Sequence, residues 1–256
     1  IEAACWIAIS RADRVILAGD HCQLPPTIKC IEAARGGLGR TLLEKVVLHK
    51  PETMSLLKIQ YRMHEDIMRF PSRWFYHDEL EAAPEVKYRG ILDFDTPVSW
   101  IDTSELDLQE KAVAEGTGRL NTGEAELLVR ELKNYMERIG IRRILEEHID
   151  FGVISPYRAQ VHYLRHLLKK EPFFRPCRRL ITVHTVDGFQ GQERDVIMIS
   201  LVRANEKGQI GFLRDLRRMN VAITRARMKL LILGEAVTLT RHPFYRELYE
   251  YIGGLR

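Results

Sequence analysis

The chain has 256 residues, of which 45% are hydrophobic and 29% charged, and its formal net charge is +4 at pH 7. This composition is typical of a globular protein with one main domain, and it excludes a membrane-spanning helix because no apolar run approaches the roughly 18 residues that one requires. The small positive charge favours an anionic partner only weakly, and the apolar start Ile1–Ile9 lacks the basic leader of a signal peptide, so the sequence predicts a cytoplasmic protein.

The first part of the chain predicts one strand and two helices. The short apolar run Arg14–Gly19 leads into a Gly-Asp pair, as a buried strand does where it passes into a loop. The prolines in the sequence HCQLPP that follows exclude regular structure there. Helices are predicted at Thr41–Leu48 and at about Asp66–Phe75, and a loop-rich stretch is predicted from His77 to Gly118.

The second half of the chain alternates strands with helices. Thr122 is predicted to cap a helix that ends near Ile139, and further helices are predicted at Tyr157–Lys170 and Leu213–Arg225. Four apolar runs are predicted strands: 150–155, 180–184, 196–202 and 229–233. Since strands that alternate with helices form a parallel sheet with helices on its faces, the sequence predicts an α/β fold.

Polar groups gather in a few segments of this predicted sheet. In such a sheet the functional residues lie in the loops that follow the carboxyl ends of the strands. The polar segments are Asp20–Pro26, Ser155–Arg158, Thr185–Glu193 and the Arg-rich helix that ends at Arg227. We therefore expect the site in these segments.

Two arginines have surroundings that suit phosphoryl transfer. This reaction requires positive charge against the transferring phosphate, and an arginine supplied from a second domain can deliver that charge. Arg62 lies in QYRMHEDI, and Arg225 lies in RRMNVAITRAR. A single arginine without context is more often part of a surface salt bridge, so this alternative stays open on the residues alone.

Four sequence blocks together resemble a known family. They are GDHCQLPP from Gly19, QYRMH from Gln60, TVDGFQGQERDVI from Thr185 and RRMNVAITRAR from Arg217. In this order they resemble superfamily-one helicases of the nonsense-mediated-decay (Upf-like) type, which include the immunoglobulin-mu-binding-protein helicases. The resemblance implies a RecA-like fold of the P-loop NTPase type, with helices on both faces of the sheet. One small departure is Gly188, where the family commonly has a residue such as serine.

The resemblance also implies roles for individual residues toward ATP. Gln23 would sense the γ-phosphate, and Arg62 and Arg225 would reach it across a cleft between two domains. Tyr61 would lie against the adenine. Glu193, with Gly191 beside it, would bind the ribose.

A bound single strand of DNA or RNA is the second partner that the resemblance implies. Its backbone would contact Ser155, Thr185 and Arg203. Because such contacts tolerate any sequence, as a translocating enzyme requires, binding is expected to depend strongly on salt.

The chain lacks the motif that would hold the nucleotide phosphates. A P-loop reads G-x-x-x-x-G-K-[ST], whereas the nearest run, ARGGLGRT at Ala34–Thr41, has Ala34 for the first glycine and Arg40 for the lysine. We interpret it as a glycine-rich loop that caps a helix. ATP and Mg²⁺ would thus be bound mainly by a first RecA-like domain, of which residues 1–28 would be the last piece, while residues 29–256 would form the second domain.

The expected function is the C-terminal half of an ATP-dependent helicase that is inactive alone. The alternative is a non-catalytic nucleic-acid-binding module on the same fold. Such a module would not need Gln23, Arg62, Glu193 and Arg225, and their presence favours the enzyme. An unrelated small-molecule enzyme is not supported, because the sequence has neither a nucleophile–base pair nor a G-x-G-x-x-G loop.

Three further groups have a structural interpretation. The four cysteines have no Cys-x-x-Cys spacing, so neither a zinc site nor a disulfide framework is predicted. His162 and His166 have metal-ligand spacing on a helix but are expected on its solvated face. The aromatic run Trp74–Tyr76 could stack on bases, and we expect it in the core instead.

Overall fold

The computed structural model describes residues 2–26, 28, 30–113 and 118–255. Its internal contacts divide the chain into two compact units, Ile1–Leu57 (unit 1) and Lys58–Arg256 (unit 2). The division falls later in the chain than the domain boundary expected after residue 28, which stays a prediction. None of the helices in the described ranges is long and apolar enough to cross a membrane.

Unit 1 is built from short helices. They are α1 (Glu2–Ile9), α2 (Ile31–Ala33), which runs into the π-helical turn Ala34–Leu38, and α3 (Leu42–His49), which is followed by the 3-10 turn Pro51–Thr53. Thr41 begins α3 with a capping box, because its hydroxyl accepts from the Glu44 amide at 3.1 Å while the Glu44 carboxylate accepts from the Thr41 amide at 2.6 Å. The part of the ARGGLGRT prediction that has this run cap a helix is confirmed, whereas the glycine-rich loop expected there is wrong, because Ala34–Leu38 form a π-helical turn.

The strand expected at Arg14–Gly19 is wrong. These residues have no regular structure and are exposed, Ile16 to 89%. A buried strand has to satisfy its backbone groups with a neighbouring strand, and within the described residues no strand pairs with this run. Apolar sequence alone therefore did not determine its structure.

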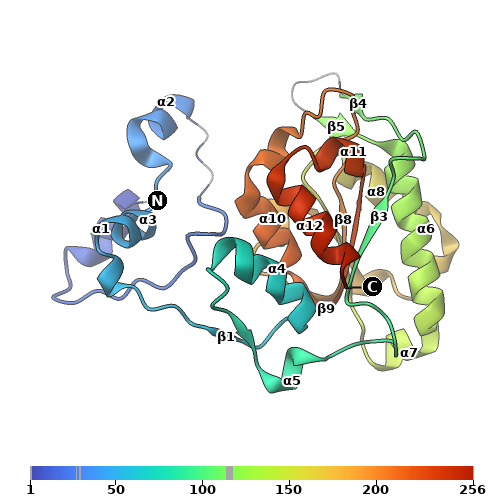
Figure 1. The fold of residues 1–256 in the computed structure, drawn as a ribbon, viewed down its shortest axis with the longest axis horizontal. Helices are drawn as coiled ribbons and strands as arrows, with labels where there is room; N and C mark the ends of the chain where they lie inside the picture. The colour runs from blue at the N-terminus through green and yellow to red at the C-terminus, as the bar shows by residue number, and fades with distance from the viewer. Residues whose placement is uncertain (1, 27, 29, 114–117, 256) are drawn as a thin grey trace. The chain divides into compact units, whose positions relative to one another are not determined.

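Unit 2 contains the predicted parallel sheet (Figure 1). Its five strands are hydrogen-bonded in the order β3-β9-β8-β6-β7, and every pairing is parallel. Their bounds are β3 (Val98–Asp102), β6 (Phe151–Ser155), β7 (Ile181–Thr185), β8 (Arg194–Ser200) and β9 (Ala226–Gly234). Four of them overlap the four predicted strands, so the α/β prediction is confirmed.

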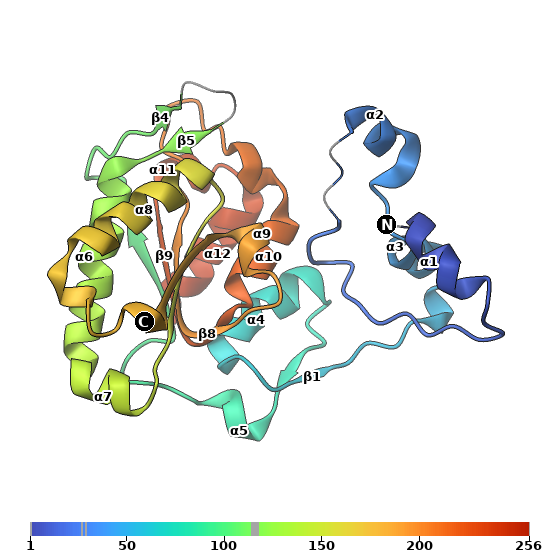
Figure 2. The same ribbon diagram turned by 180° about the vertical axis from the view of Figure 1, so that it is seen from behind.

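Helices cover both faces of this sheet. One face carries α6 (Thr122–Ile139) and α8 (Arg158–Lys170), and the other carries α4 (Glu65–Phe75), α9 (Val186–Phe189), α10 (Leu216–Ile223) and α12 (Pro243–Gly253) (Figure 1, Figure 2). The remaining short elements are α5 (Pro84–Lys87), α7 (Ile141–Glu146), α11 (Ala236–Leu239), the 3-10 turns Pro172–Phe174, Arg178–Leu180 and Gly211–Arg214, the parallel pair β1 (Ile59–Gln60) and β2 (Glu81–Ala82), and the antiparallel pair β4 (Lys111–Ala112) and β5 (Arg119–Leu120).

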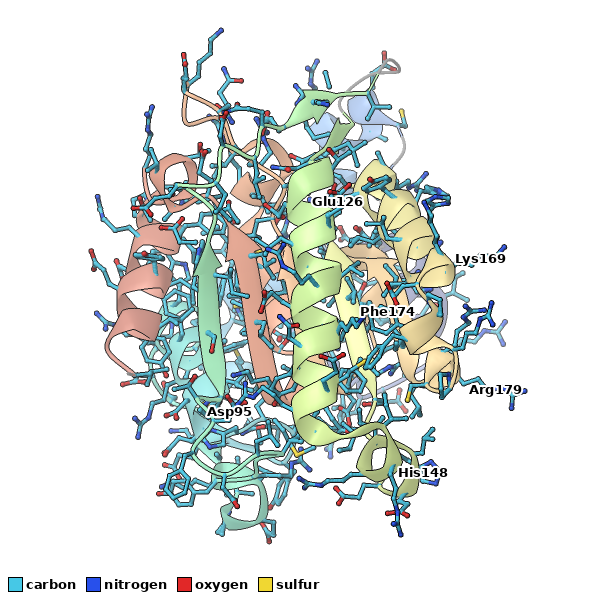
Figure 3. All side chains as sticks on the ribbon, turned by 90° about the vertical axis from the view of Figure 1, so that its right-hand side faces the viewer. Asp95, Glu126, His148, Lys169, Phe174 and Arg179 are labelled. Carbon is cyan, nitrogen blue, oxygen red and sulfur yellow. The ribbon has the colours of Figure 1, made fainter. Side chains whose placement is uncertain are left out.

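The main core lies between the sheet and the helices α6 and α8. Leu132 and Met136 of α6 and Leu164 of α8 are fully buried against Phe151 and Val153 of β6. Figure 3 shows α6 lying along the sheet on this face. The apolar positions of both helices recur every three or four residues, which places them on the side that faces the sheet.

The stretch expected to be loop-rich, His77–Gly118, contains a strand of the main sheet. β3 forms its edge beside β9, and the Trp100 indole donates to the Gly234 carbonyl at 3.0 Å. The strand was missed because it is only five residues long, follows Pro97 and carries polar residues on its less buried side. The helix at 122–139 is confirmed, although Asn121 rather than Thr122 caps it, by accepting from the Glu124 amide at 3.0 Å.

Candidate nucleotide and nucleic-acid sites

An arginine cluster surrounds the carboxylate of Glu193. Arg62 donates its Nε to one Glu193 oxygen, and Arg227 binds the other with its Nε at 3.0 Å and its Nη2 at 2.9 Å. Glu193 directly precedes β8 and Arg227 lies in β9, and the two strands are neighbours with Arg194 paired to Ala226. The sheet therefore brings these distant parts of the sequence together.

The loop that carries Arg62 is fixed by the side chain of Gln60. The Gln60 Oε1 accepts from the amides of Arg62 and Met63 at 2.9 and 2.7 Å, and its Nε2 donates to the Met63 carbonyl at 2.8 Å. The Arg62 side chain remains 36% exposed. Beside it Tyr61 is 67% exposed, so both side chains are accessible to a ligand.

Arg225 lies beneath this cluster and is only 3% exposed. Its guanidinium donates to the Val221 carbonyl at 3.1 Å, the Gln192 carbonyl at 3.2 Å and the Thr224 hydroxyl at 3.1 Å. Arg62 reaches the same segment, because its Nη1 donates to the Thr224 carbonyl at 3.2 Å. The structure thus brings both predicted arginines together, one at the surface and one held inside.

The charges of the cluster keep Glu193 ionised. Partial burial acts to raise the pKa of Glu193, but the hydrogen bonds and charges of Arg62 and Arg227 outweigh it and hold this pKa below its ordinary value. Burial acts to lower the pKa of Arg227, and its hydrogen bonds to Glu193 and Asp195 reverse that effect and raise it. Glu193 is therefore a fixed anion that orients two arginines.

Gly191 forms the turn that leads into Glu193. Its φ is +80°, in the left-handed region that residues with a Cβ rarely adopt, and a Cβ added there would meet no atom within 4 Å. Glycine is favoured at this position by the backbone conformation and not by lack of space.

Gln23 lies in unit 1, in a turn organised by Asp20. One Asp20 oxygen accepts from the Cys22 amide at 2.9 Å, and the other accepts from the Gln23 side-chain amide at 2.7 Å. The side chains of Asp20, His21 and Cys22 offer ligand atoms within 4.8 Å of one another, but all come from one short turn, which is common without a metal ion.

Ser155 and Thr185 are neighbours at the carboxyl ends of β6 and β7, where the register pairs them directly. The Thr185 hydroxyl accepts from the Gly188 amide at 3.3 Å and caps α9. The Ser155 hydroxyl is buried and accepts from the Tyr157 amide at 3.5 Å. These two residues, predicted to bind the nucleic-acid backbone, thus lie at the same end of the sheet. The hydroxyl groups of both form local hydrogen bonds.

Comparison with known proteins decides the family. An AAA domain model matches residues 38–237, which is more than half of the chain, and a second AAA domain model matches residues 1–30. The chain belongs to the AAA domain family of Upf-like superfamily-one helicases.

Several relatives match almost the whole chain. DNA-binding protein SMUBP-2 of Rattus norvegicus is 36% identical over 98% of the chain and 25% of its own length. An uncharacterized ATP-dependent helicase of Methanocaldococcus jannaschii is 36% identical over 98% of the chain and 36% of its length, and the regulator of nonsense transcripts 1 homolog of Drosophila melanogaster is 34% identical over 98% and 21%. The chain thus spans about a fifth to a third of the length of these relatives.

Among solved structures, the C-terminal domain of a possible DNA helicase from Lactobacillus plantarum matches 69% of the chain and 88% of its own length. It is 15% identical, with a TM-score of 0.38.

Arg203 is not at the surface where a strand-binding residue of such a helicase would lie. It is 4% exposed, pairs with Glu110 at 2.6 Å and donates to the Tyr157 hydroxyl at 3.3 Å. Burial acts to lower the pKa of Arg203, but its bonds to Glu110 and Tyr157 raise it. In this conformation Arg203 joins two segments of unit 2 to each other, and its predicted contact with nucleic acid would require it to leave Glu110.

The predicted site residues of this helicase domain do not share one end of the sheet. Ser155 and Thr185 follow strands, as expected, but Glu193 and Arg225 directly precede β8 and β9 and so lie at the amino ends. The expectation that all functional segments follow carboxyl ends was wrong, because the segment after Thr185 runs back along the sheet before β8 begins.

Sequence reasoning assigned no role to Arg227, which lies in β9 and not in the expected Arg-rich helix. Gln60 was missed as well. It stands two positions before Arg62 in QYRMH, and only its backbone-directed hydrogen bonds reveal its role. His162 and His166 are exposed, as expected. The aromatic run Trp74–Tyr76 is half-buried and not in the core as expected, although Trp74 packs edge-on against the buried Phe244 with ring centroids 5.1 Å apart.

Proposed function

We propose that the chain is the C-terminal RecA-like half of an ATP-dependent helicase or translocase that moves along single-stranded DNA or RNA. A first RecA-like domain would supply the P-loop and the acidic residues that hold ATP and Mg²⁺. One observation carries this proposal: Glu193 orients two arginines at the surface, with Arg225 directly beneath them. A cytoplasmic location stays a prediction from composition.

The cluster suits a site that is completed only when ATP arrives. Arg62 is bound to Glu193 and is partly exposed, so a triphosphate, which carries more negative charge than one carboxylate, can draw it away. Glu193 would keep Arg227 and remain oriented toward the ribose. Charge would then reach the γ-phosphate only with ATP in place, which couples hydrolysis to closure of the two domains.

The remaining nucleotide contacts follow the family pattern. Tyr61 offers an exposed ring to the adenine, and Gly191 shapes the turn that presents Glu193. Gln23 would sense the γ-phosphate from its Asp20-organised turn. For the nucleic acid, Ser155 and Thr185 mark the sheet edge at which the strand would bind.

The test is strand-stimulated ATP hydrolysis by the full-length polypeptide that contains this chain, compared with the 256-residue chain alone. We expect single-stranded DNA or RNA to stimulate hydrolysis by the former and no hydrolysis by the latter. Equal turnover by the 256-residue chain would refute the half-motor proposal. Strand binding without any hydrolysis by the full-length polypeptide would instead favour the non-catalytic binding module.

A further inference from the structure

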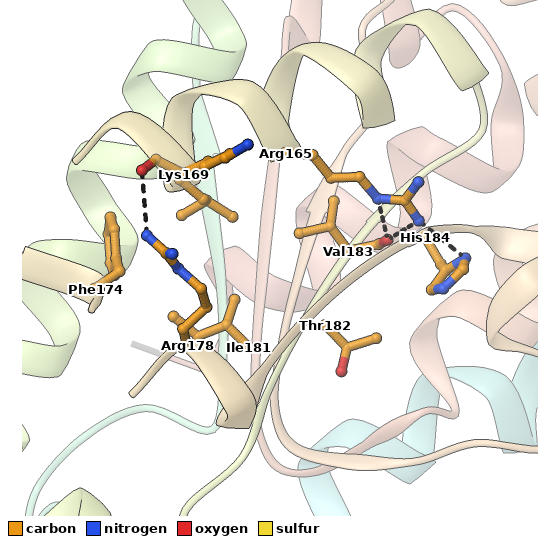
Figure 4. Close-up of a pocket in the computed structure, with 9 residues that line it drawn as sticks. Arg165, Lys169, Phe174, Arg178, Ile181, Thr182, Val183 and His184 are labelled. Carbon is orange, nitrogen blue, oxygen red and sulfur yellow. Dashed lines mark hydrogen bonds between the residues drawn. The ribbon is translucent and has the colours of Figure 1, made fainter. Parts of the chain in front are cut away.

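A groove of about 470 Å³ lies along the edge of the main sheet, and its lining contains none of the residues of the arginine cluster around Glu193 (Figure 4). Arg165 and Lys169 of α8, Arg178 of the following 3-10 turn and His184 of β7 line it, and apolar side chains complete its walls. β7 is the last strand of the sheet, so no further strand covers this side of the groove among the described residues.

The cations of this groove are oriented but not neutralised. Arg165 donates to the Val183 carbonyl with its Nε at 3.0 Å and its Nη2 at 2.6 Å, and Arg178 donates to the Lys169 carbonyl at 3.2 Å (Figure 4). In the described part of the chain, the side chains of Arg165, Lys169 and Arg178 form no ion pair with a carboxylate. Backbone carbonyls fix the direction of Arg165 and Arg178 and leave the full charge of both side chains available to an anion.

His184 contributes a polar side chain to the groove and not a further positive charge. Burial first, and then the positive charges of Arg165 and Arg194, lower the pKa of His184 below its ordinary value. A neutral imidazole is therefore expected at neutral pH, and its Nδ1 lies 3.3 Å from Arg165 Nη2, where it can accept a hydrogen bond.

The groove continues a basic stripe along α8. Arg158, His162, Arg165 and Lys169 are four, three and four residues apart, a spacing that puts them on one helix face, and all four are exposed. The stripe spans ~16 Å at the rise of an α-helix. The stripe begins near Ser155, at the end of the sheet that is proposed to bind the single-stranded nucleic acid. Figure 3 shows Lys169 and Arg179, near the other end of the stripe, pointing away from the sheet.

We propose that this stripe and groove bind the phosphate backbone of the nucleic acid beyond the nucleotides held at Ser155 and Thr185. The inference rests on the proposed function and extends its binding site along α8. Unneutralised cations repeated along a line match a chain of phosphates, and the direct continuity with the Ser155–Thr185 edge favours nucleic acid over an acidic peptide. The contacts would be independent of base sequence.

The test compares two double variants of the 256-residue chain with equal loss of charge. Lys169→Gln/Arg178→Gln removes two cations of the groove, and Arg73→Gln/Arg246→Gln removes two exposed cations from α4 and α12, on the other face of the sheet. Fluorescence anisotropy measures binding to labelled oligodeoxythymidine and oligouridine of ~10 and ~30 nucleotides over a range of salt. Thermal melting checks that each variant is folded.

We expect the groove variant to lose affinity for the longer oligonucleotide and to bind the shorter one like wild type. Its plot of log K against log salt should be shallower by about 1.4, since each lost phosphate contact in a single strand contributes about 0.7. The control variant should keep the wild-type slope.

Three results would overturn the inference, and the third would also contradict the nucleic-acid binding in the proposed function. A groove variant with wild-type affinity and slope for the longer oligonucleotide removes the groove from the binding site. Direct binding of labelled polyglutamate that is lost in the groove variant, while nucleic-acid binding is unchanged, would assign the groove to an acidic peptide. No binding of either oligonucleotide by wild type at low salt would refute strand binding by this chain, and with it this extension.

Discussion

At the scale of single residues, Glu124 shows how one buried carboxyl can make stability depend on pH. It is fully buried near the start of α6, where its Oε1 accepts from the Ser200 hydroxyl at 2.5 Å and from the Val202 amide at 2.9 Å. Among the described residues its Oε2 has no hydrogen-bond partner. Burial is the main cause that raises the pKa of Glu124 from 4.5 to about 7.

This shift predicts that Glu124 lowers stability as the pH rises. The unfolded chain ionises this carboxyl near pH 4.5, whereas the folded chain keeps the proton up to about pH 7. The free energy of unfolding should therefore fall between these values by ~3 kcal/mol through this group alone. Urea unfolding of wild type and Glu124→Gln across this range measures it. This fall in the free energy of unfolding should be absent in Glu124→Gln. It should be present in Glu137→Gln, an exposed control on the same helix. Parallel plots of the free energy of unfolding against pH for wild type and Glu124→Gln would contradict the role of Glu124.

At the scale of elements, the turn before β8 depends on the backbone of Gly191. Gly191→Ala adds a methyl group into open space but forces an L-residue to φ +80°, so we expect it to destabilise the protein by about 1–2 kcal/mol. Gly253→Ala is the matched control, because it also meets no atom within 4 Å and lies at the end of α12 with an ordinary φ. Urea unfolding should show the control to be neutral or slightly stabilising. Equal effects of the two changes would disprove a conformational requirement at Gly191.

Elements with strong periodicity were predictable from sequence, and short or partner-dependent ones were not. α6 and α8 were placed because their apolar residues recur at helical spacing over many turns. β3 was missed because five residues next to a proline carry little pattern, and the strand at Arg14–Gly19 was expected wrongly because a strand also needs a neighbour to pair with.

For the candidate site, the sequence named some of the residues that the structure brings together but not their geometry. Arg62, Glu193 and Arg225 were named from sequence blocks, but their separation into one exposed and one buried arginine follows from contacts between β8, β9 and the Arg62 loop. Arg203 carries the same kind of signal as the other arginines, and only the structure reveals its pairing with Glu110. Motifs identify candidate chemistry, whereas accessibility depends on packing.

At the scale of the whole molecule, the proposed ATP site is a half-site that would work only with a second domain. The arginine cluster contributes charge and orientation, and it contains no group that could cradle the phosphates of ATP on its own. Its two predicted arginines differ in accessibility, since Arg62 is at the surface and Arg225 is 3% exposed. Both should nevertheless matter to hydrolysis if the cluster acts as a unit.

The most direct measurement is single-turnover ATP hydrolysis by the full-length polypeptide at saturating ATP and single strand, for wild type, Arg62→Ala, Arg225→Ala and the exposed control Arg73→Ala. Each cluster variant should hydrolyse ATP about a hundredfold or more slowly, as expected for a lost transition-state charge, while Arg73→Ala retains the wild-type rate. Thermal melting identifies any loss of folding in Arg225→Ala, and Arg62→Ala, whose side chain is at the surface, then carries the test. Wild-type rates in the cluster variants would show that these arginines do not act on the γ-phosphate.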